Sequence, residues 1–284
     1  MITDIHTHTF PDRIAGRALE ELSQKAHIRP FLDATNSALR RSMKEAGIGR
    51  SIVLPVATAA RQVEKLNNAA VAVNERASET GVFSFGCIHP DYEGYHEELS
   101  RIAALGLKGI KIHPVYQGTD IDDIRFLRII DRAAQLGLIV ITHAGLDVGY
   151  PGAVNCSPRM CRHVVDEIGD FPFILAHMGG WNNWDEVPYY LADTGVYLDT
   201  AFSEGRMSPL PDGYWKEEDI DMLDPEGFVS LIRKFGAERI LFGTDSPWSD
   251  QKECLQFIRS LPLTEDEIEL ILEKNAGRLL DARV

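Results

Sequence analysis

Short apolar runs separated by helix-like segments recur along the whole chain, and this alternation restricts the fold more than any other feature. Eight runs are rich in β-branched or apolar residues and are bounded by turn residues. They cover Ile2–His8, Ser51–Val56, Phe83–His89, Gly109–His113, Leu138–His143, Phe173–His177, Val196–Asp199 and Ile240–Thr244. Segments with helical spacing of apolar residues lie between them, for example Asp123–Leu136. The pattern predicts a repeated strand–helix unit.

A glycine that follows a helical segment precedes every strand after the first. These glycines are Gly47, Gly81, Gly106, Gly137, Gly169, Gly195 and Gly236. Glycine accepts left-handed geometry and commonly ends a helix, so the helix-to-strand connections are short. The connections after strands 1, 5 and 7 are long, and they cover Thr9–Asn36, Ala144–Met160 and Ala201–Asp224. These long loops share one end of the sheet.

Strands such as Leu138–Ile141 are apolar on both faces, as in a parallel sheet that helices cover. Eight βα units of about 30 residues fit a (β/α)8 TIM barrel, which usually has about 250 residues plus loop insertions. We therefore expect an α/β protein in which residues 1–284 form a single TIM-barrel domain with long βα loops after strands 1, 5 and 7. A doubly wound sheet has the same periodicity, but the Gly-rich dinucleotide-binding fingerprint is absent after the first strand.

Composition narrows the partners and the compartment. The chain has 29 Lys and Arg against 43 Asp and Glu, a net charge of −14, which disfavours nucleic acid and anionic membranes as partners. No signal peptide and no apolar stretch of about 18 residues is visible, so we expect a cytoplasmic protein. The four cysteines form no CxxC pair and are expected to be reduced thiols.

Residues of the metal-ligand type stand at the carboxyl ends of several predicted strands. In the first strand, His6 and His8 are two residues apart, so the pleat points both rings to the same side, where they can share one metal. His143 ends strand 5, His177 ends strand 6 and Asp245 follows strand 8. Active sites of TIM barrels lie at this end of the strands, so we expect these five side chains to converge.

Three imidazoles and a carboxylate match a borderline divalent metal with one position open for water or substrate. Zinc is the first choice, and manganese, iron or cobalt are alternatives. Such a metal lowers the pKa of its bound water towards about 7 and polarises a carbonyl or phosphoryl oxygen. Asp245 would then accept the water proton, and His177 would orient the water or stabilise an oxyanion.

The order of several motifs resembles the amidohydrolase superfamily, in particular the amidohydrolase-2 branch with the aminocarboxymuconate-semialdehyde and resorcylate decarboxylases. The motifs are D-x-H-T-H at the start, GLKGIKIHP at strand 4, THAG at strand 5, AHMGG at strand 6, GTDSPW at strand 8 and KNAGRLL at the end. The resemblance implies a (β/α)8 barrel with one catalytic metal held by His6, His8, His143 and Asp245. It places His177 beside the metal-bound water.

Strand 4 departs from the binuclear members of the superfamily, which carry a bridging glutamate or carboxylated lysine there. It reads Leu107–His113 and contains no acid, which favours one metal. Lys111 and His113 share a face of this strand. A carboxylated Lys111 that bridges two metals remains an alternative to a Lys111 that binds a substrate carboxylate.

Substrate recognition is expected from the loops at the same rim. Arg159 and Tyr116 are candidates to grip an anionic group. Trp181 and Trp248 follow strands 6 and 8 and are further candidates, together with Lys111 and His113. Tryptophans at one rim equally fit a subunit interface, so a homo-oligomer remains an alternative.

From these features we expect a metal-dependent hydrolase that uses a metal-activated water on an amide, ester or lactone-like bond of a small molecule. Decarboxylation or hydration of a small aromatic or unsaturated carboxylic acid is the first alternative, since the same site in relatives performs lyase chemistry. A TatD-like phosphoesterase is a second alternative, which the net charge and the missing acid of strand 4 disfavour. A non-catalytic metal-binding barrel is a third. Fold and metal define the reaction repertoire, whereas the loops select the substrate.

Overall fold

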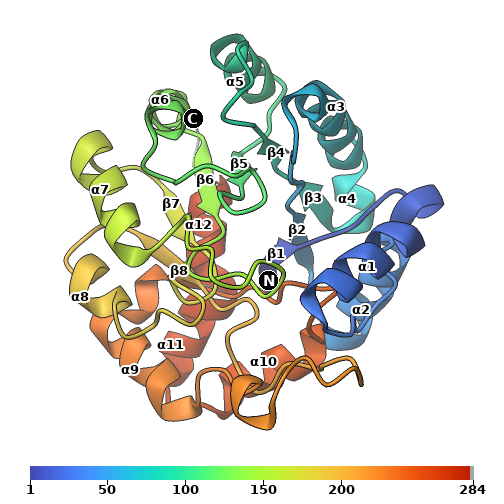
Figure 1. Cartoon of the computed structure of the whole chain (residues 1–284), viewed down its shortest axis with the longest axis vertical. Helices are drawn as coiled ribbons and strands as arrows, with labels where there is room; N and C mark the ends of the chain where they lie inside the picture. Colours follow the sequence, from blue (N-terminus) through green and yellow to red (C-terminus); the bar gives the residue numbers. More distant parts are fainter. Residues whose placement is uncertain (282–284) are drawn as a thin grey trace.

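The computed structural model describes residues 1–281, and its strands form a parallel barrel (Figure 1). The described strands are β1 (Thr3–Thr7), β2 (Arg50–Val53), β3 (Val82–Ser84), β4 (Gly86–Cys87), β5 (Gly109–Ile112), β6 (Ile139–Thr142), β7 (Phe173–Leu175), β8 (Tyr197–Asp199) and β9 (Ile240–Leu241). They pair in the orders β1-β2-β3 and β4-β5-β6-β7-β8-β9, and every pair is parallel. The expected α/β class is therefore confirmed.

Two junctions join these sheets into a ring of eight barrel positions. On one side, the Ile5 amide donates to the Phe242 carbonyl at 2.9 Å, and Thr7 forms a parallel bridge with Ser246. On the other side, β3 and β4 both overlap the predicted third strand, and the Phe85 amide between them donates to the Val53 carbonyl at 3.0 Å. The third barrel strand is therefore one extended segment with a local irregularity at Phe85.

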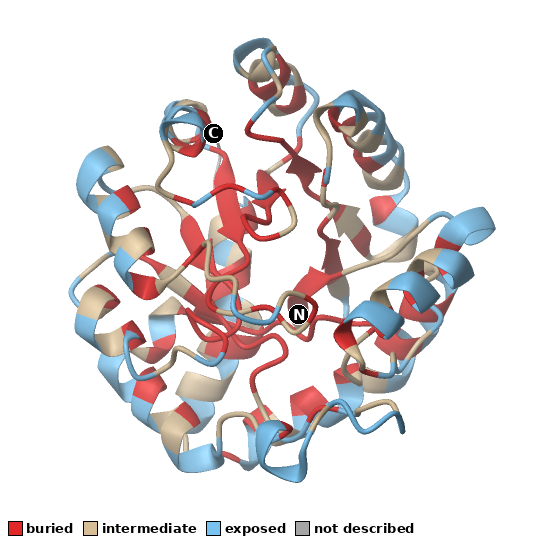
Figure 2. Cartoon of the chain, viewed as in Figure 1, coloured by how far each residue is buried: buried red, intermediate tan, exposed pale blue. Residues whose placement is uncertain are grey.

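Helices surround the barrel and turn their buried faces inward (Figure 2). The described α-helices are α1 (Asp12–Ala26), α2 (Asn36–Ala46), α3 (Val63–Asn74), α4 (Ala77–Thr80), α5 (Tyr95–Ala104), α6 (Ile124–Gln135), α7 (Pro158–Ile168), α8 (Val187–Leu191), α9 (Pro225–Phe235), α10 (Gln251–Ser260), α11 (Glu265–Glu269) and α12 (Asn275–Asp281). Short turns are η1 (Ala60–Gln62), η2 (Glu217–Asp219), η3 (Ala237–Arg239) and the π-helical η4 (Leu270–Lys274).

Helix α6 illustrates how the sequence sets these boundaries. Asp123 caps the helix, because its carboxylate accepts the amide of Arg125. Four buried residues at helical spacing, Phe126, Ile129, Ile130 and Ala133, face the sheet. Gly137 follows with a φ of 68°, a left-handed conformation that turns the chain into β6.

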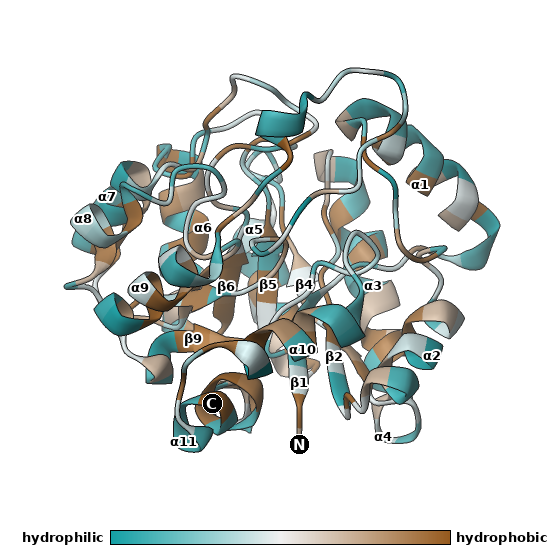
Figure 3. Cartoon of the chain, turned by 90° about the horizontal axis from the view of Figure 1, so that it is seen from below, coloured by the Kyte–Doolittle hydropathy of each residue, from teal (hydrophilic) through white to brown (hydrophobic). Residues whose placement is uncertain are grey.

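The apolar core has two layers. The larger one lies between the strands and the helices, and the smaller one includes Ile5, Phe85, Ile141 and Ile174 from the strands. Ala276 and Leu280 of α12 belong to the smaller cluster. Helix α12 therefore covers the end of the barrel that lies away from the long loops (Figure 3).

The long loops lie together at the carboxyl ends of the strands (Figure 3), and one of them differs from expectation. The predicted loop after the first strand contains α1, which buries Ala15, Leu19, Ser23 and Ala26 along one side. This amphipathic spacing stabilises a helix despite the many polar residues around it. β6 and β8 are the predicted fifth and seventh strands. The segments that follow them remain largely irregular, apart from η2. In the described residues, no helix is both long enough and apolar enough to cross a bilayer.

Candidate metal centre

Two histidines of β1 are held by their Nδ1 atoms and turn Nε2 toward each other. His6 Nδ1 lies 2.8 Å from a carboxylate oxygen of Asp199, and His8 Nδ1 lies 2.8 Å from the Leu54 carbonyl. Carboxylates and carbonyls only accept hydrogen bonds, so both Nδ1 atoms carry the proton. In the neutral rings each Nε2 then presents a lone pair, which is the form that binds a metal.

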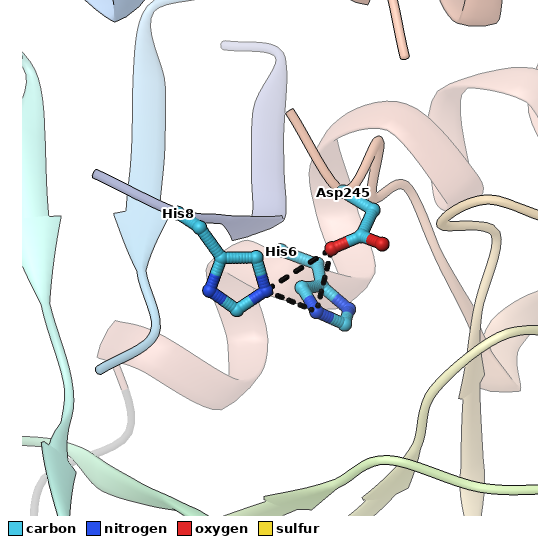
Figure 4. A group of neighbouring side chains, drawn as sticks. All are labelled: His6, His8 and Asp245. Atoms are coloured by element: carbon cyan, nitrogen blue, oxygen red, sulfur yellow. Dashed lines mark hydrogen bonds and ion pairs between the residues drawn. The ribbon is translucent and has the colours of Figure 1, made fainter. Parts of the chain in front are cut away.

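Asp245 completes a set of three converging acceptor atoms (Figure 4). Its Oδ1 lies 3.0 Å from His8 Nε2 and 3.4 Å from His6 Nε2, and the two nitrogens are 3.2 Å apart. Lone pairs at such distances repel unless a cation or a shared proton lies between them. Two imidazole nitrogens and a carboxylate are suitable ligands for a divalent metal. These three residues therefore fit the predicted metal centre.

His143 and His177 form a second facing pair beside this set. His143 Nε2 donates to the Leu146 carbonyl at 2.9 Å, and His177 Nδ1 donates to the Ala201 carbonyl at 2.8 Å. The remaining nitrogens, His143 Nδ1 and His177 Nε2, lie 3.1 Å apart. The His6 and His177 ring centroids are 5.3 Å apart, so all five residues that the strand-end argument singled out gather at one place.

The backbone turns sharply at two of these residues. His177 and Asp245 both have a φ of 60°, a left-handed conformation that side-chain-bearing residues adopt at a cost. Asp245 is held there by its amide, which donates to the His6 carbonyl at 2.8 Å. Residues in such conformations concentrate at functional sites, where the surroundings hold them in place.

Burial keeps the imidazoles of His6, His143 and His177 neutral. His6 is 1% exposed and His143 is 4% exposed, and burial lowers the pKa of each ring well below its usual value. Burial also lowers the pKa of His177, to about 4. Because protons compete with a metal for imidazole lone pairs, neutral rings at pH 7 are ready to coordinate.

Lys111 points from β5 into the same cluster. Its side chain is 1% exposed, and Nζ lies 3.4 Å from His6 Nε2. Burial lowers the pKa of Lys111 to about 8, although the negative charges of Asp199 and Asp245 oppose this shift. β5 corresponds to the predicted fourth strand, and its residues include no carboxylate. The strand therefore places an amine, and no bridging acid, beside the ligand set.

His113 and Asp147 form a wall next to His143. His113 Nε2 lies 3.6 Å from Asp147 Oδ2, and the His113 and His143 rings stack at 4.3 Å with 12° between their planes. These three residues offer ligand atoms close to one another. However, parallel rings direct their lone pairs side by side, and His143 Nε2 carries the proton that it donates to Leu146. The group therefore suits substrate contact better than a second metal.

The other predicted substrate residues lie at different depths. Tyr116 meets the His113 ring edge to face at 4.2 Å. Trp181 and Trp248 belong to or pack against a rim cluster of apolar residues, Ala26, Ile28, Trp181, Phe202, Met207 and Ile220. Arg159 is exposed in the first turn of α7, and no hydrogen bond or ion pair within residues 1–281 links it to the centre.

Sequence reasoning missed two buried carboxylates. Asp199 ends β8 and holds His6, while its Oδ1 accepts the amides of His177 at 2.9 Å and Ala201 at 3.1 Å. The position of Asp199 at the end of a predicted strand was the sequence signal that could have placed it in the site. Asp147 lies in the irregular segment after β6, where the sequence gives no signal of its position.

Comparison with a family model identifies the family of this chain. A family model described as Amidohydrolase, of the amidohydrolase-2 type, matches residues 3–282. The chain belongs to this amidohydrolase family. Enzymes of the family bind a divalent metal. A search of curated proteins found no match to this sequence.

Solved structures share the fold of this amidohydrolase over nearly its whole length. An uncharacterised TIM-barrel protein from Bordetella bronchiseptica has a TM-score of 0.73 at 18% identity, and the match covers 99% of this chain and 98% of that one. The 5-carboxyvanillate decarboxylase LigW from Sphingomonas paucimobilis has a TM-score of 0.68 at 14% identity, with 99% of each chain covered. A dihydroxybenzoic acid decarboxylase from Polaromonas, with bound manganese and 2-nitroresorcinol, has a TM-score of 0.67 at 16% identity, covering 99% and 97%. The expected TIM-barrel fold is confirmed.

Proposed function

We propose that this amidohydrolase is a metal-dependent lyase that decarboxylates a small aromatic or unsaturated carboxylic acid. The observation that carries the proposal is the buried amine of Lys111, which lies 3.4 Å from Nε2 of His6, one of the candidate metal ligands. Once a divalent cation is bound, this ammonium faces a like charge at close range, and an anion between them removes the repulsion. A substrate carboxylate supplies that anion, whereas a neutral ester or amide does not.

The ligands of the metal would be His6, His8, His143 and Asp245, with zinc first and manganese, iron or cobalt as alternatives. When bound, the metal supplies Lewis-acid chemistry that polarises the oxygens of the substrate. Asp199 and the Leu54 carbonyl fix the tautomers of His6 and His8.

The remaining residues bind the acid and move the proton. Lys111 pairs with the substrate carboxylate, and His113, Tyr116 and Asp147 contact the rest of the molecule. In the reaction, the bond to the carboxyl carbon breaks, carbon dioxide leaves, and its electron pair remains on the substrate carbon, which takes up one proton. Because Nδ1 of His177 donates its proton to the Ala201 carbonyl, Nε2 is the atom that would first take up a proton from solvent and then pass it to that carbon.

The decarboxylase neighbours support this choice over the hydrolase that the sequence first suggested, which is not confirmed. Their names refer to carboxylic acids of this class as substrates, although at 14 and 16% identity they share only the fold. Hydrolysis is the second candidate, because His177 and Asp245 beside a bound metal would equally orient and deprotonate a water. The absence of an acid on β5 continues to disfavour a phosphoesterase with several metals.

One experiment separates these readings. Purified protein is analysed for metal and then offered aromatic and unsaturated acids, esters, amides, lactones and phosphodiesters in parallel. We expect about one metal per chain and release of carbon dioxide from an acid. Turnover of esters or lactones alone would favour the hydrolase, and full metal without any turnover would favour a non-catalytic barrel. Two metals together with a carboxylated lysine would support the bridging role of Lys111.

Further parts of the proposal rest on the sequence. We propose a single domain over residues 1–284, a small-molecule substrate, and no nucleic-acid or membrane partner. The four free, buried cysteines are compatible with the proposed cytoplasmic location. Size-exclusion chromatography with light scattering tests whether the chain forms a homo-oligomer.

A further inference from the structure

Four of the five residues of the metal centre are almost completely covered by protein, and only the His8 side chain is partly open, at 20% exposure. His143 and His177 are buried, and Asp245 is only 9% exposed. A substrate must nevertheless reach the open side of the metal. Movement of a covering segment would widen this narrow approach to the size of a substrate.

The segment between β6 and α7 is placed to be this cover. It crosses the middle of the barrel mouth as the yellow-green loop in Figure 1. Backbone hydrogen bonds hold both of its ends: Gly145 donates to Cys156 at 2.8 Å, Leu146 donates to Trp181 at 2.9 Å, and Asn155 accepts from Ile121 at 2.8 Å.

Residues 147–154, which we call the tip, are held differently. Within the described chain, the backbone hydrogen bonds of the tip are internal, from Tyr150 to Asp147 at 3.0 Å and from Ala153 to Tyr150 at 3.1 Å. The Asp147 carboxylate also accepts the Gly149 amide at 2.8 Å. The tip is therefore a self-contained turn that can move without breaking backbone hydrogen bonds to the barrel.

Side chains alone connect the tip to its surroundings. Tyr150 meets the ring of Tyr116 edge to face at 5.0 Å, and Tyr116 meets His113 in the same way at 4.2 Å. His113 in turn stacks on His143. A column of rings thus runs from the tip to a residue of the metal centre.

Lys25 holds the outer end of this column. Its Nζ lies 3.3 Å from the centroid of the Tyr150 ring and 5.6 Å from that of Tyr116. Lys25 stands in the last turn of α1, which is anchored elsewhere: the Trp215 indole donates to the Ala26 carbonyl at 2.9 Å, and His27 stacks on Tyr214 at 3.8 Å. A cation over an aromatic face is attracted by it, so a fixed helix end holds the tip down.

We propose that residues 147–154 form a lid over the metal centre and that Lys25 is its latch. Opening separates Lys25 from Tyr150 and withdraws Asp147 from His113, which exposes the space beside the ligands. Closing restores the wall and excludes water. The inference rests on the proposed metal-dependent function for its purpose, but the latch itself is a property of the tip and α1.

The test uses the purified, metal-loaded chain and two readouts that require no substrate. One is the rate at which excess EDTA removes the metal, and the other is hydrogen–deuterium exchange of the amides in residues 147–154. Lys25→Met keeps the apolar stem and removes the charge. Lys44→Met is the matched control, because Lys44 is exposed in the last turn of α2. Tyr150→Leu removes the ring, whereas Tyr150→Phe keeps its face.

An exposed cation–π contact stabilises by about 0.5–1 kcal/mol, so we expect Lys25→Met and Tyr150→Leu each to accelerate both processes about two- to fivefold. Lys44→Met and Tyr150→Phe should match the parent chain. The double variant should be no faster than Tyr150→Leu, because the two changes remove the same contact.

Unchanged rates in Lys25→Met, or additive effects in the double variant, would overturn the latch. An equal acceleration in Lys44→Met would do the same, since it would assign the effect to helix charge. If the purified protein held no metal, the proposed function would fail, while the exchange of the tip would still decide whether Lys25 restrains it. Thermal unfolding of each variant confirms that the barrel remains folded.

Discussion

Replacement of Asp199 by asparagine tests whether the tautomer of His6 controls the metal centre. In the parent chain, Asp199 Oδ2 accepts from His6 Nδ1 at 2.8 Å, and Oδ1 accepts two backbone amides. An asparagine has only one oxygen, and the two amides require it. Its NH2 group then faces the N–H of His6, and two donors oppose each other. His6 is relieved only by moving its proton to Nε2, the atom that would bind the metal.

The size of the effect follows from this single contact. A hydrogen bond to a charged group is worth about 1.5–3 kcal/mol, and loss of a partner that orients a metal ligand typically weakens metal binding about 10- to 100-fold. We therefore expect Asp199→Asn to raise the Kd for zinc or manganese by this factor. The fold should persist, because the backbone amides of His177 and Ala201 keep their acceptor.

The assay is competition with a chromophoric chelator at pH 7, with thermal unfolding as a check on folding. Asp170→Asn is the control, since Asp170 is exposed and makes the same chemical change away from the centre. Metal affinity equal to that of the parent chain in Asp199→Asn would refute the tautomer argument. Equal weakening in both variants would assign the effect to net charge instead.

Three further predictions address the ligands, the core and the dependence on pH. His6→Ala and Asp245→Asn should each lower metal content and abolish turnover, whereas His177→Asn should keep most of the metal and lose rate; metal analysis and activity measured together distinguish these results. Phe85→Ala should cost about 3–5 kcal/mol in urea denaturation, since Phe85 is 1% exposed inside the barrel. Burial raises the pKa of Glu204 from 4.5 to about 7. Between these values the folded chain retains a proton that the unfolded chain has released, so this group lowers stability as pH rises, by about 1 kcal/mol per pH unit. Glu204→Gln should remove this contribution to the fall in urea midpoint between pH 5 and pH 7. An unchanged dependence of the midpoint on pH would contradict the raised pKa of Glu204.

The local rules of the chain were enough to predict most of the barrel and the gathering of five side chains at one end of it. Alternation along β1 puts His6 and His8 on one side, and the parallel arrangement brings His143, His177 and Asp245 to the same end. These inferences need only the strand period and the direction of the strands. They do not depend on how loops pack.

What sequence reasoning missed depends on contacts between distant segments. Lys25 meets Tyr150 across an irregular loop, and no local pattern indicates that pairing. Asp147 is brought to His113 by the same loop. The helix α1 was also overlooked, because its apolar face is interrupted by polar residues such as Ser23, which is buried and donates to the Ile28 carbonyl.

The left-handed backbone at His177 and Asp245 has a consequence for engineering this barrel. A glycine at either position would relieve the strained φ of 60° by about 1 kcal/mol while removing a reactive side chain. Selection for thermal stability alone is therefore expected to enrich inactive chains with Asp245→Gly among the survivors. A library for a more robust enzyme should keep both positions fixed and seek its gains in the helices, away from the rim that performs the chemistry.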